Sequence, residues 1–135
     1  MTVSACQSML TQCPTGVTRA VDPDGILFSR SETKNRGTRA GVDGKGRAAK
    51  FFNIAAMTCD AAGNLWVSDG SNHAIRKVTP DGAVTTIAGL GMAGNTDGDS
   101  TKAMFNYPCG ITIDNAGTVF VADKSNCRIR KLEYK

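Results

Sequence analysis

The sequence lacks several patterns on which membrane spans and common catalytic sites depend. Nowhere does it run apolar for the roughly eighteen residues that a membrane helix needs, and its start, MTVSACQSMLTQC, has no basic flank followed by a continuous apolar stretch. Its five cysteines form no CxxC pair, and its one histidine, His73, belongs to no Ser-His-Asp or Cys-His arrangement. We therefore expect no membrane segment, no signal peptide, no metal and no cofactor, and a cytoplasmic location is favoured.

The composition that remains is that of a folded chain with a mild basic surplus. Apolar residues make up 41% of the 135 positions and charged residues 21%, which favours a globular structure over disorder. The formal net charge of +4 would tolerate an anionic partner without requiring one.

An internal repeat dominates the sequence. A shift of 54 residues aligns 51–77 with 105–131, and twelve of these 27 positions are identical. A fainter copy, VDPDGILF at 21–28, corresponds to IDNAGTVF at 113–120 but lies closer to the next copy than the repeat length allows. A repeat of this length is typical of architectures in which each unit buries its faces against its neighbours.

Within a unit, the residues predict four short strands joined by tight turns. Segments such as NLWVS, TVFVA and AVTTIA are rich in β-branched and aromatic residues, while DAAG, DNAG and TPDG between them favour turns. A repeated four-stranded antiparallel unit is typical of a β-propeller blade. We therefore predict an all-β chain.

The motif of the last copy resembles the NHL repeat. It reads Phe-Asn-x-Pro-x-Gly-Ile at 105–111, then VFVAD at 119–123 and Asn126-x-Arg-Ile-Arg-Lys at 126–131. The resemblance implies a ring of about six blades, with the Pro-x-Gly-Ile strand innermost and the VTTIAG strand outermost. This chain is long enough only for a partial propeller of about two and a half to three NHL-type blades.

The repeat boundaries divide the chain into four segments. We assign 1–13 to an N-terminal lead-in, 14–36 to a degenerate first repeat of two strands, 37–90 to a second repeat with its preceding Gly-rich loop, and 91–135 to a third repeat without its outer strand. An arc of blades leaves faces and edges open. The chain is therefore expected to be a fragment of a longer propeller, or to form homo-oligomers that complete the ring.

Recurring polar residues are predicted to be structural rather than catalytic or metal-binding. Because they recur at the same places in the repeat, we expect their side-chain oxygens to cap turns, and their glycines to supply positive φ. In the family pattern His73 is likewise a structural repeat residue. The positions are Asp60, Gly63, Asp69, Asn72, His73, Asp114, Gly117, Asp123 and Asn126.

Two further patterns have competing interpretations. Asn95-x-Asp97-x-Asp99 resembles the opening of a calcium loop, but Ser100 and Asn106 replace the required glycine and glutamate, which favours a turn. Phe28, Trp66 and Phe120 share one repeat position, where packing between blades is favoured over stacking on nucleic-acid bases.

A basic set on the third strand of each unit gives the main alternative function. Some NHL propellers bind RNA through a basic face, and alternation would place two of these arginines on the same face of their strands. The same residues occur in NHL propellers that bind only protein, where they would pair with turn aspartates. This possible interaction or RNA-contact surface consists of Arg76, Lys77, Arg128, Arg130 and Lys131.

We expect a non-enzymatic module that mediates protein–protein interaction through the loops at one end of the blades. RNA binding through the basic face is the first alternative. The second is a piece of a propeller enzyme whose site lies outside this chain, since NHL-like lyases hold their metal on several histidines and His73 alone cannot supply that set.

Overall fold

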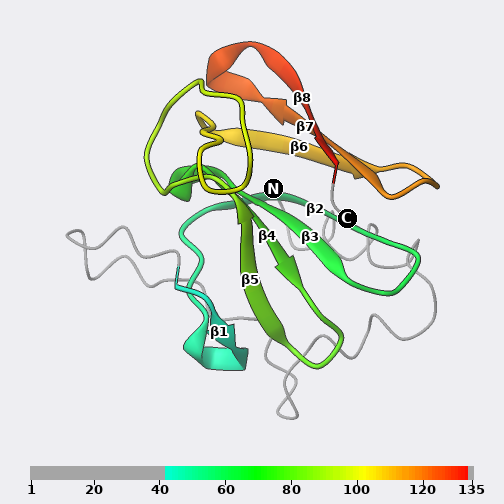
Figure 1. Ribbon diagram of the computed structural model, residues 1–135. Helices are drawn as coiled ribbons and strands as arrows, with labels where there is room; N and C mark the ends of the chain where they lie inside the picture. The colour runs from blue at the N-terminus through cyan, green and yellow to red at the C-terminus, as the bar shows by residue number, and fades with distance from the viewer. Residues whose placement is uncertain (1–41, 134–135) are drawn as a thin grey trace.

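A computed structural model describes residues 42–133, which form two antiparallel sheets packed face to face (Figure 1). The first sheet has the order β1-β5-β4-β3-β2, and the second has the order β6-β7-β8. The strands are β1 (Gly44–Lys45), β2 (Ile54–Cys59), β3 (Leu65–Asp69), β4 (Ala74–Val78), β5 (Ala83–Ala88), β6 (Pro108–Ile113), β7 (Thr118–Asp123) and β8 (Arg128–Glu133).

These sheets confirm the predicted all-β, partial-propeller fold. Strands β2 to β5 lie within 37–90 and form what we call the second blade; β6 to β8 lie within 91–135 and form the third blade. The proposed lead-in at 1–13 and the degenerate repeat at 14–36 lie outside the described residues. One detail of the expectation is wrong: β5 is not outermost, because β1 pairs along its outer side. Across 42–133, no helix has the length and apolarity to cross a membrane.

The turns between the first two strands of each blade form as their sequences predict. The Asp60 carboxylate accepts backbone N–H groups of Ala62 (3.0 Å) and Asn64 (2.9 Å), and Gly63 has a φ of 86°. The third blade repeats this arrangement. There Asp114 accepts the N–H groups of Ala116 and Thr118, both at 2.9 Å, and Gly117 has a φ of 85°. Side-chain capping and positive-φ glycines therefore close both turns.

The opposite end of each blade has a different turn, which the repeat also conserves in detail. Short 3-10 turns, η3 (Gly70–Asn72) and η4 (Lys124–Asn126), follow β3 and β7. Each ends on a left-handed residue, His73 or Cys127, with a φ of 52°. These two turns therefore have the same backbone conformation in both blades.

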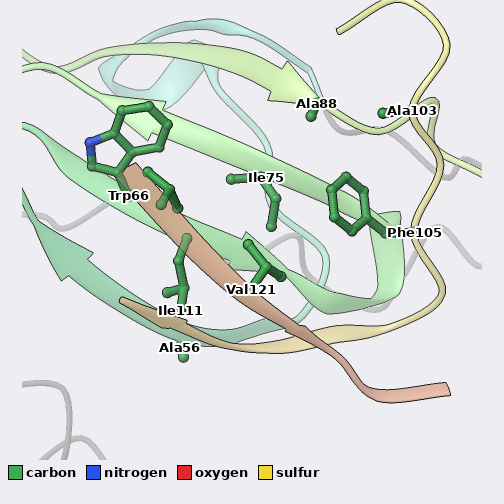
Figure 2. Packing of buried hydrophobic residues seen from close by; sticks show 9 residues of the cluster. Ala56, Trp66, Ile75, Ala88, Ala103, Phe105, Ile111 and Val121 are labelled. Carbon is green, nitrogen blue, oxygen red and sulfur yellow. The ribbon is translucent and has the colours of Figure 1, made fainter. Parts of the chain in front are cut away.

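A hydrophobic core joins the two blades (Figure 2). Strand alternation sends Trp66 of β3 and Ile75 of β4 to the side of the second blade that faces the third, where they meet Ile111 and Val121. Phe105, from the connecting segment, fills the same cluster. The predicted packing role of Trp66 is confirmed, since its side chain is 1% exposed.

The other face of the second blade carries a separate cluster. Leu65 and Val67 alternate with Trp66 along β3 and therefore point the opposite way, toward Phe51 and Val84. By the same alternation, Phe120 lies on the face of the third blade that is turned away from the second. It is only half-buried there.

Candidate functional site

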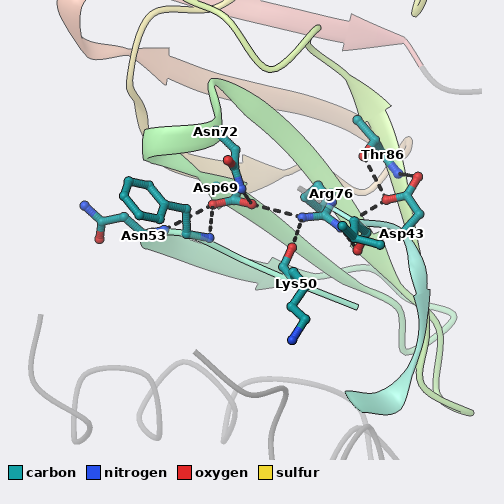
Figure 3. Close-up of polar contacts among 9 residues, drawn as sticks. Asp43, Lys50, Asn53, Asp69, Asn72, Arg76 and Thr86 are labelled. Atoms are coloured by element: carbon teal, nitrogen blue, oxygen red, sulfur yellow. Dashed lines mark hydrogen bonds and ion pairs between the residues drawn. The ribbon is translucent and has the colours of Figure 1, made fainter. Parts of the chain in front are cut away.

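The polar centre of the second blade is a buried Asp–Asn–Arg network (Figure 3). One oxygen of Asp69 accepts the backbone N–H groups of Phe52 (3.2 Å) and Asn53 (3.3 Å). Its other oxygen accepts Nδ2 of Asn72 (2.7 Å) and Nη1 of Arg76 (3.0 Å). Because the Asp69 and Arg76 side chains are both 0% exposed, each charge depends on the other.

Arg76 also forms hydrogen bonds with residues 42–50, the segment that precedes the blade. Its guanidinium donates to the carbonyl oxygens of Lys50 (2.8 Å) and Val42 (2.9 Å) and to the Asp43 carboxylate (3.0 Å). The same group lies 4.6 Å from the centroid of the Phe51 ring. One side chain therefore joins the sheet, the loop and the apolar cluster.

The third blade repeats the network with equivalent residues. Asp123 accepts the Asn106 N–H (2.8 Å) through one oxygen, and Nδ2 of Asn126 (2.7 Å) and Nη1 of Arg130 (2.9 Å) through the other. Arg130 also contacts the carbonyl oxygens of Met104 (3.0 Å) and Thr96 (3.1 Å), the Asp97 carboxylate and the Phe105 ring.

These networks correct the predicted roles of the aspartates and arginines. Asp69 and Asp123 do accept backbone N–H groups, but those groups belong to the segment before the blade rather than to the turn that follows. Arg76 is 0% exposed and Arg130 is 9% exposed, so neither belongs to an RNA-contact or interaction surface. The sequence shows which face of the strand the arginines share, but not that the preceding loop covers that face.

The remaining members of the basic set are more accessible, and each has a neighbour. Lys77 is half-buried with its ammonium 5.4 Å from the Trp66 ring centroid. Arg128 is exposed and donates to Oδ1 of Asn95 (3.1 Å). Lys131 pairs with Glu133 at 2.6 Å, a contact that raises the pKa of Lys131 and lowers that of Glu133. Of the five basic residues, these three are the ones that remain at least partly accessible.

An accessible polar and aromatic surface lies where the two blades meet, at the end that carries η3 and η4. The Tyr107 N–H donates to Nδ1 of His73 (2.9 Å), and the Asn53 side-chain amide donates to the Tyr107 hydroxyl. The Lys124 ammonium lies 5.6 Å from the Tyr107 ring centroid. We call Asn53, Tyr107 and Lys124 the junction surface; His73 links the blades beneath it, in keeping with its structural repeat position.

Tyr107 is the member of this surface that sequence reasoning missed. Its φ of 56° is a left-handed conformation that bulky residues rarely adopt. The equivalent position of the second blade is Asn53. Because the two residues differ, the repeat pattern did not single out Tyr107. Contacts from both blades hold the ring in place, which makes it a rigid aromatic group at an interblade boundary.

The acidic residues and cysteines of the described chain were considered as possible metal ligands or reactive thiols. The described part of the chain contains no group of three or more His, Cys, Asp or Glu residues placed to hold a metal ion. Asp97 pairs with Arg130, and Asp99 caps the backbone N–H of Thr101 (2.9 Å), in agreement with a turn. Cys109 and Cys127 are free thiols, whereas Cys59 is disulfide-bonded.

The face-to-face antiparallel sheets, their 54-residue equivalence and their shared buried networks define a β-propeller protein. Residues 105–132 match the family model described as NHL repeat. The chain belongs to the NHL-repeat β-propeller family.

The chain spans only a small part of the length of the relatives and solved structures that it matches. It is 40% identical over 98 residues to NHL repeat-containing protein 2 of Bos taurus, covering 70% of this chain and 14% of that protein. It is 35% identical over 92 residues to the chloroplastic protein SUPPRESSOR OF QUENCHING 1 of Arabidopsis thaliana, covering 67% and 9%. An auxiliary nutrient binding protein from Bacteroides thetaiotaomicron superposes with a TM-score of 0.64 and 36% identity, covering 73% of this chain and 26% of that one.

Proposed function

We propose that the chain is a non-enzymatic, protein-binding section of a longer NHL propeller, and that the junction surface is its contact site. The proposal rests on family membership, which favours a propeller-type interaction module, and on the short share of each relative that this chain spans.

The observation that carries the proposal is the fixed position of Tyr107. Aromatic side chains with a polar end supply large contact area at low entropic cost, and they are enriched in protein interfaces. Here the ring lies between an exposed amide, Asn53, and an exposed ammonium, Lys124. These three groups suit a partner surface that offers apolar contact together with hydrogen-bond acceptors or carboxylates.

The RNA-binding alternative loses its main support. It depended on a stripe of guanidinium groups, and the two arginines that define the stripe lie in the interior. The enzyme alternative, with a site outside this chain, has no supporting contact in residues 42–133. RNA binding is one of the outcomes of the test below.

The test is site-specific photocrosslinking in cell extract. A benzoylphenylalanine introduced at Tyr107 is compared with one at Asn115, an exposed position in the turn at the opposite end of the third blade. We expect a discrete protein adduct at position 107, unchanged by ribonuclease and absent at position 115. Lys124→Glu should weaken it. Adducts that disappear with ribonuclease, or that form equally at both positions, would contradict the proposal.

A further inference from the structure

One contact between the two blades is made by an imidazole nitrogen that must be unprotonated. Nδ1 of His73 accepts the backbone N–H of Tyr107 at 2.9 Å. A ring nitrogen accepts a hydrogen bond only while it carries no proton, so the proton of the neutral imidazole lies on Nε2. His73 is half-buried, and it is the one histidine in the sequence. Protons from solvent can therefore reach this contact.

The contact holds Tyr107 in a backbone conformation that its repeat position does not require. Tyr107 has a φ of 56°, which is unfavourable for a bulky residue. The equivalent residue of the second blade is Asn53, and the non-glycine residues of positive φ within 42–133 are His73, Tyr107 and Cys127. The left-handed conformation therefore belongs to Tyr107 and not to the repeat position.

The Tyr107 ring lies against residues of the second blade. A Cβ added at Gly70 would be 3.3 Å from Cε1 of Tyr107, so the ring occupies the space beside this glycine. The Asn53 side-chain amide donates to the phenol oxygen. Because the backbone N–H and the ring of Tyr107 both contact the second blade, a change of φ at Tyr107 would move the ring away from Gly70 and Asn53.

In the described part of the chain, the elements that meet at this contact also bring other charged and titratable groups. Histidine is the side chain whose ordinary pKa lies between about 5 and 8, so a fall in pH through this range acts mainly on His73. Residues 89–94, which pass the His73 carbonyl at Gly89, carry no charge. The other groups are the interior Asp69–Arg76 and Asp123–Arg130 pairs, the Lys124 ammonium beside the Tyr107 ring, the Tyr107 phenol and the free thiol of Cys109 in β6.

We propose that His73 is a pH-sensitive switch for the junction surface, in which protonation of Nδ1 releases the Tyr107 N–H and frees the ring from its fixed position. Both ring nitrogens of the imidazolium carry protons, so Nδ1–H and the Tyr107 N–H would face each other as two donors. The folded state with this contact excludes the proton and the unfolded chain accepts it, so stability falls as the pH falls through the histidine range. This inference rests on the proposed function, because it describes how binding at the junction surface is regulated.

The first measurement is an NMR titration of the full chain between about pH 8 and pH 5. The imidazole signals need no separate assignment, because the chain has one histidine. We expect the proton of the neutral ring on Nε2, and we expect the Tyr107 amide signal to change with the same midpoint as the His73 ring. The amide of Asn115, in the turn at the opposite end of the third blade, is the control and should not follow that midpoint.

Two variants separate the titration of His73 from its place in the fold. His73→Asn keeps a side-chain oxygen that can accept the Tyr107 N–H, and asparagine tolerates the left-handed conformation found here. This variant should hold Tyr107 in place across the whole pH range. His73→Ala removes the acceptor, so the Tyr107 amide should lose about tenfold in hydrogen-exchange protection at neutral pH.

The second measurement uses the crosslinker at position 107, because benzoylphenylalanine keeps the backbone N–H that His73 accepts. We expect the adduct yield to fall about fivefold when the pH is lowered through the histidine range, as one hydrogen bond is lost. The yield from the His73→Asn variant should stay constant over the same range.

Three results would overturn the inference: a proton on Nδ1 at neutral pH, a Tyr107 amide that does not titrate with His73, or a pH dependence of the adduct that persists in His73→Asn. The NMR titration needs no partner, so it is independent of the proposed function. The expected titration without any adduct would contradict the proposed function alone, and an adduct without the titration would contradict the switch alone.

Discussion

The second and third blades contain the same polar network but differ in how far equivalent residues are exposed to solvent. Both hold a buried aspartate, asparagine and arginine in the same arrangement. In the second blade, β5 pairs with the edge of β4, and the third blade packs against the face of β4 that carries Ile75. Ile75 is therefore 0% exposed. In the third blade, the equivalent Ile129 is 73% exposed. The repeat therefore specifies the polar network within each blade. The burial of the residue at the Ile75 and Ile129 position depends on the strand and the blade that lie next to it.

The largest expected effect distinguishes the two arginine networks. Arg76→Ala leaves the Asp69 carboxylate without its cation in a site with no exposure, and should cost about 3–5 kcal/mol of unfolding free energy. Arg130→Ala should cost less, about 2–3 kcal/mol, because Arg130 retains some exposure and its second partner, Asp97, is largely exposed.

Urea unfolding of both variants, followed by the fluorescence of the single tryptophan, Trp66, measures this difference. Lys131→Ala is the control, and loss of its exposed ion pair should leave the urea midpoint unchanged within error. Equal losses of unfolding free energy for Arg76→Ala and Arg130→Ala would show that the two networks are buried to the same extent.

A matched pair of isoleucines tests the difference in burial directly. Ile75→Ala removes a side chain from the interblade core and should cost about 2–5 kcal/mol. Ile129→Ala makes the same chemical change at the equivalent position of the third blade, and should cost less than about 0.5 kcal/mol. Thermal unfolding monitored by circular dichroism compares them. A large loss for Ile129→Ala would mean that its face is covered in solution.

The smallest effect concerns the first turn of the second blade. The Asp60 carboxylate is partly buried, which by itself raises its pKa, but hydrogen bonds from Trp66 (3.0 Å) and Asn64 outweigh this and lower the pKa below the ordinary 3.8. Asp60 therefore stabilises the fold at pH values above its unfolded pKa, and this contribution is lost as the pH falls through the lower, folded pKa.

Carboxyl NMR titration should place the Asp60 pKa below 3.8, and Trp66→Phe should raise it. Phenylalanine is the natural residue at the equivalent position of the third blade, Phe120, and it has no indole N–H. A pKa that Trp66→Phe leaves unchanged would remove the indole hydrogen bond from this explanation.

Local patterns were sufficient to predict most of the fold. The strands, the Asp60 and Asp114 turns and the interblade position of Trp66 follow from alternation and turn chemistry within a few residues. The two-residue strand β1 is too short to carry such a pattern. Its pairing with β5 therefore could not be predicted.

The candidate site was harder to predict, because its features depend on segments distant in sequence. Burial of Arg76 requires Val42 and Lys50 to fold over the sheet, some thirty residues earlier in the chain. The left-handed conformation of Tyr107 depends on contacts with His73 and Asn53 of the other blade. A strand pattern records which residues share a face, but not which loop will cover them.

The measurement that tests the central comparison most directly is amide hydrogen exchange, resolved by NMR, on the full chain. The account predicts slow exchange throughout β4, whose neighbours pair with it on both sides, and fast exchange at alternate residues of β8, whose N–H groups point away from β7. Uniform protection along β8 would contradict it, because the edge of the third blade would then already be covered.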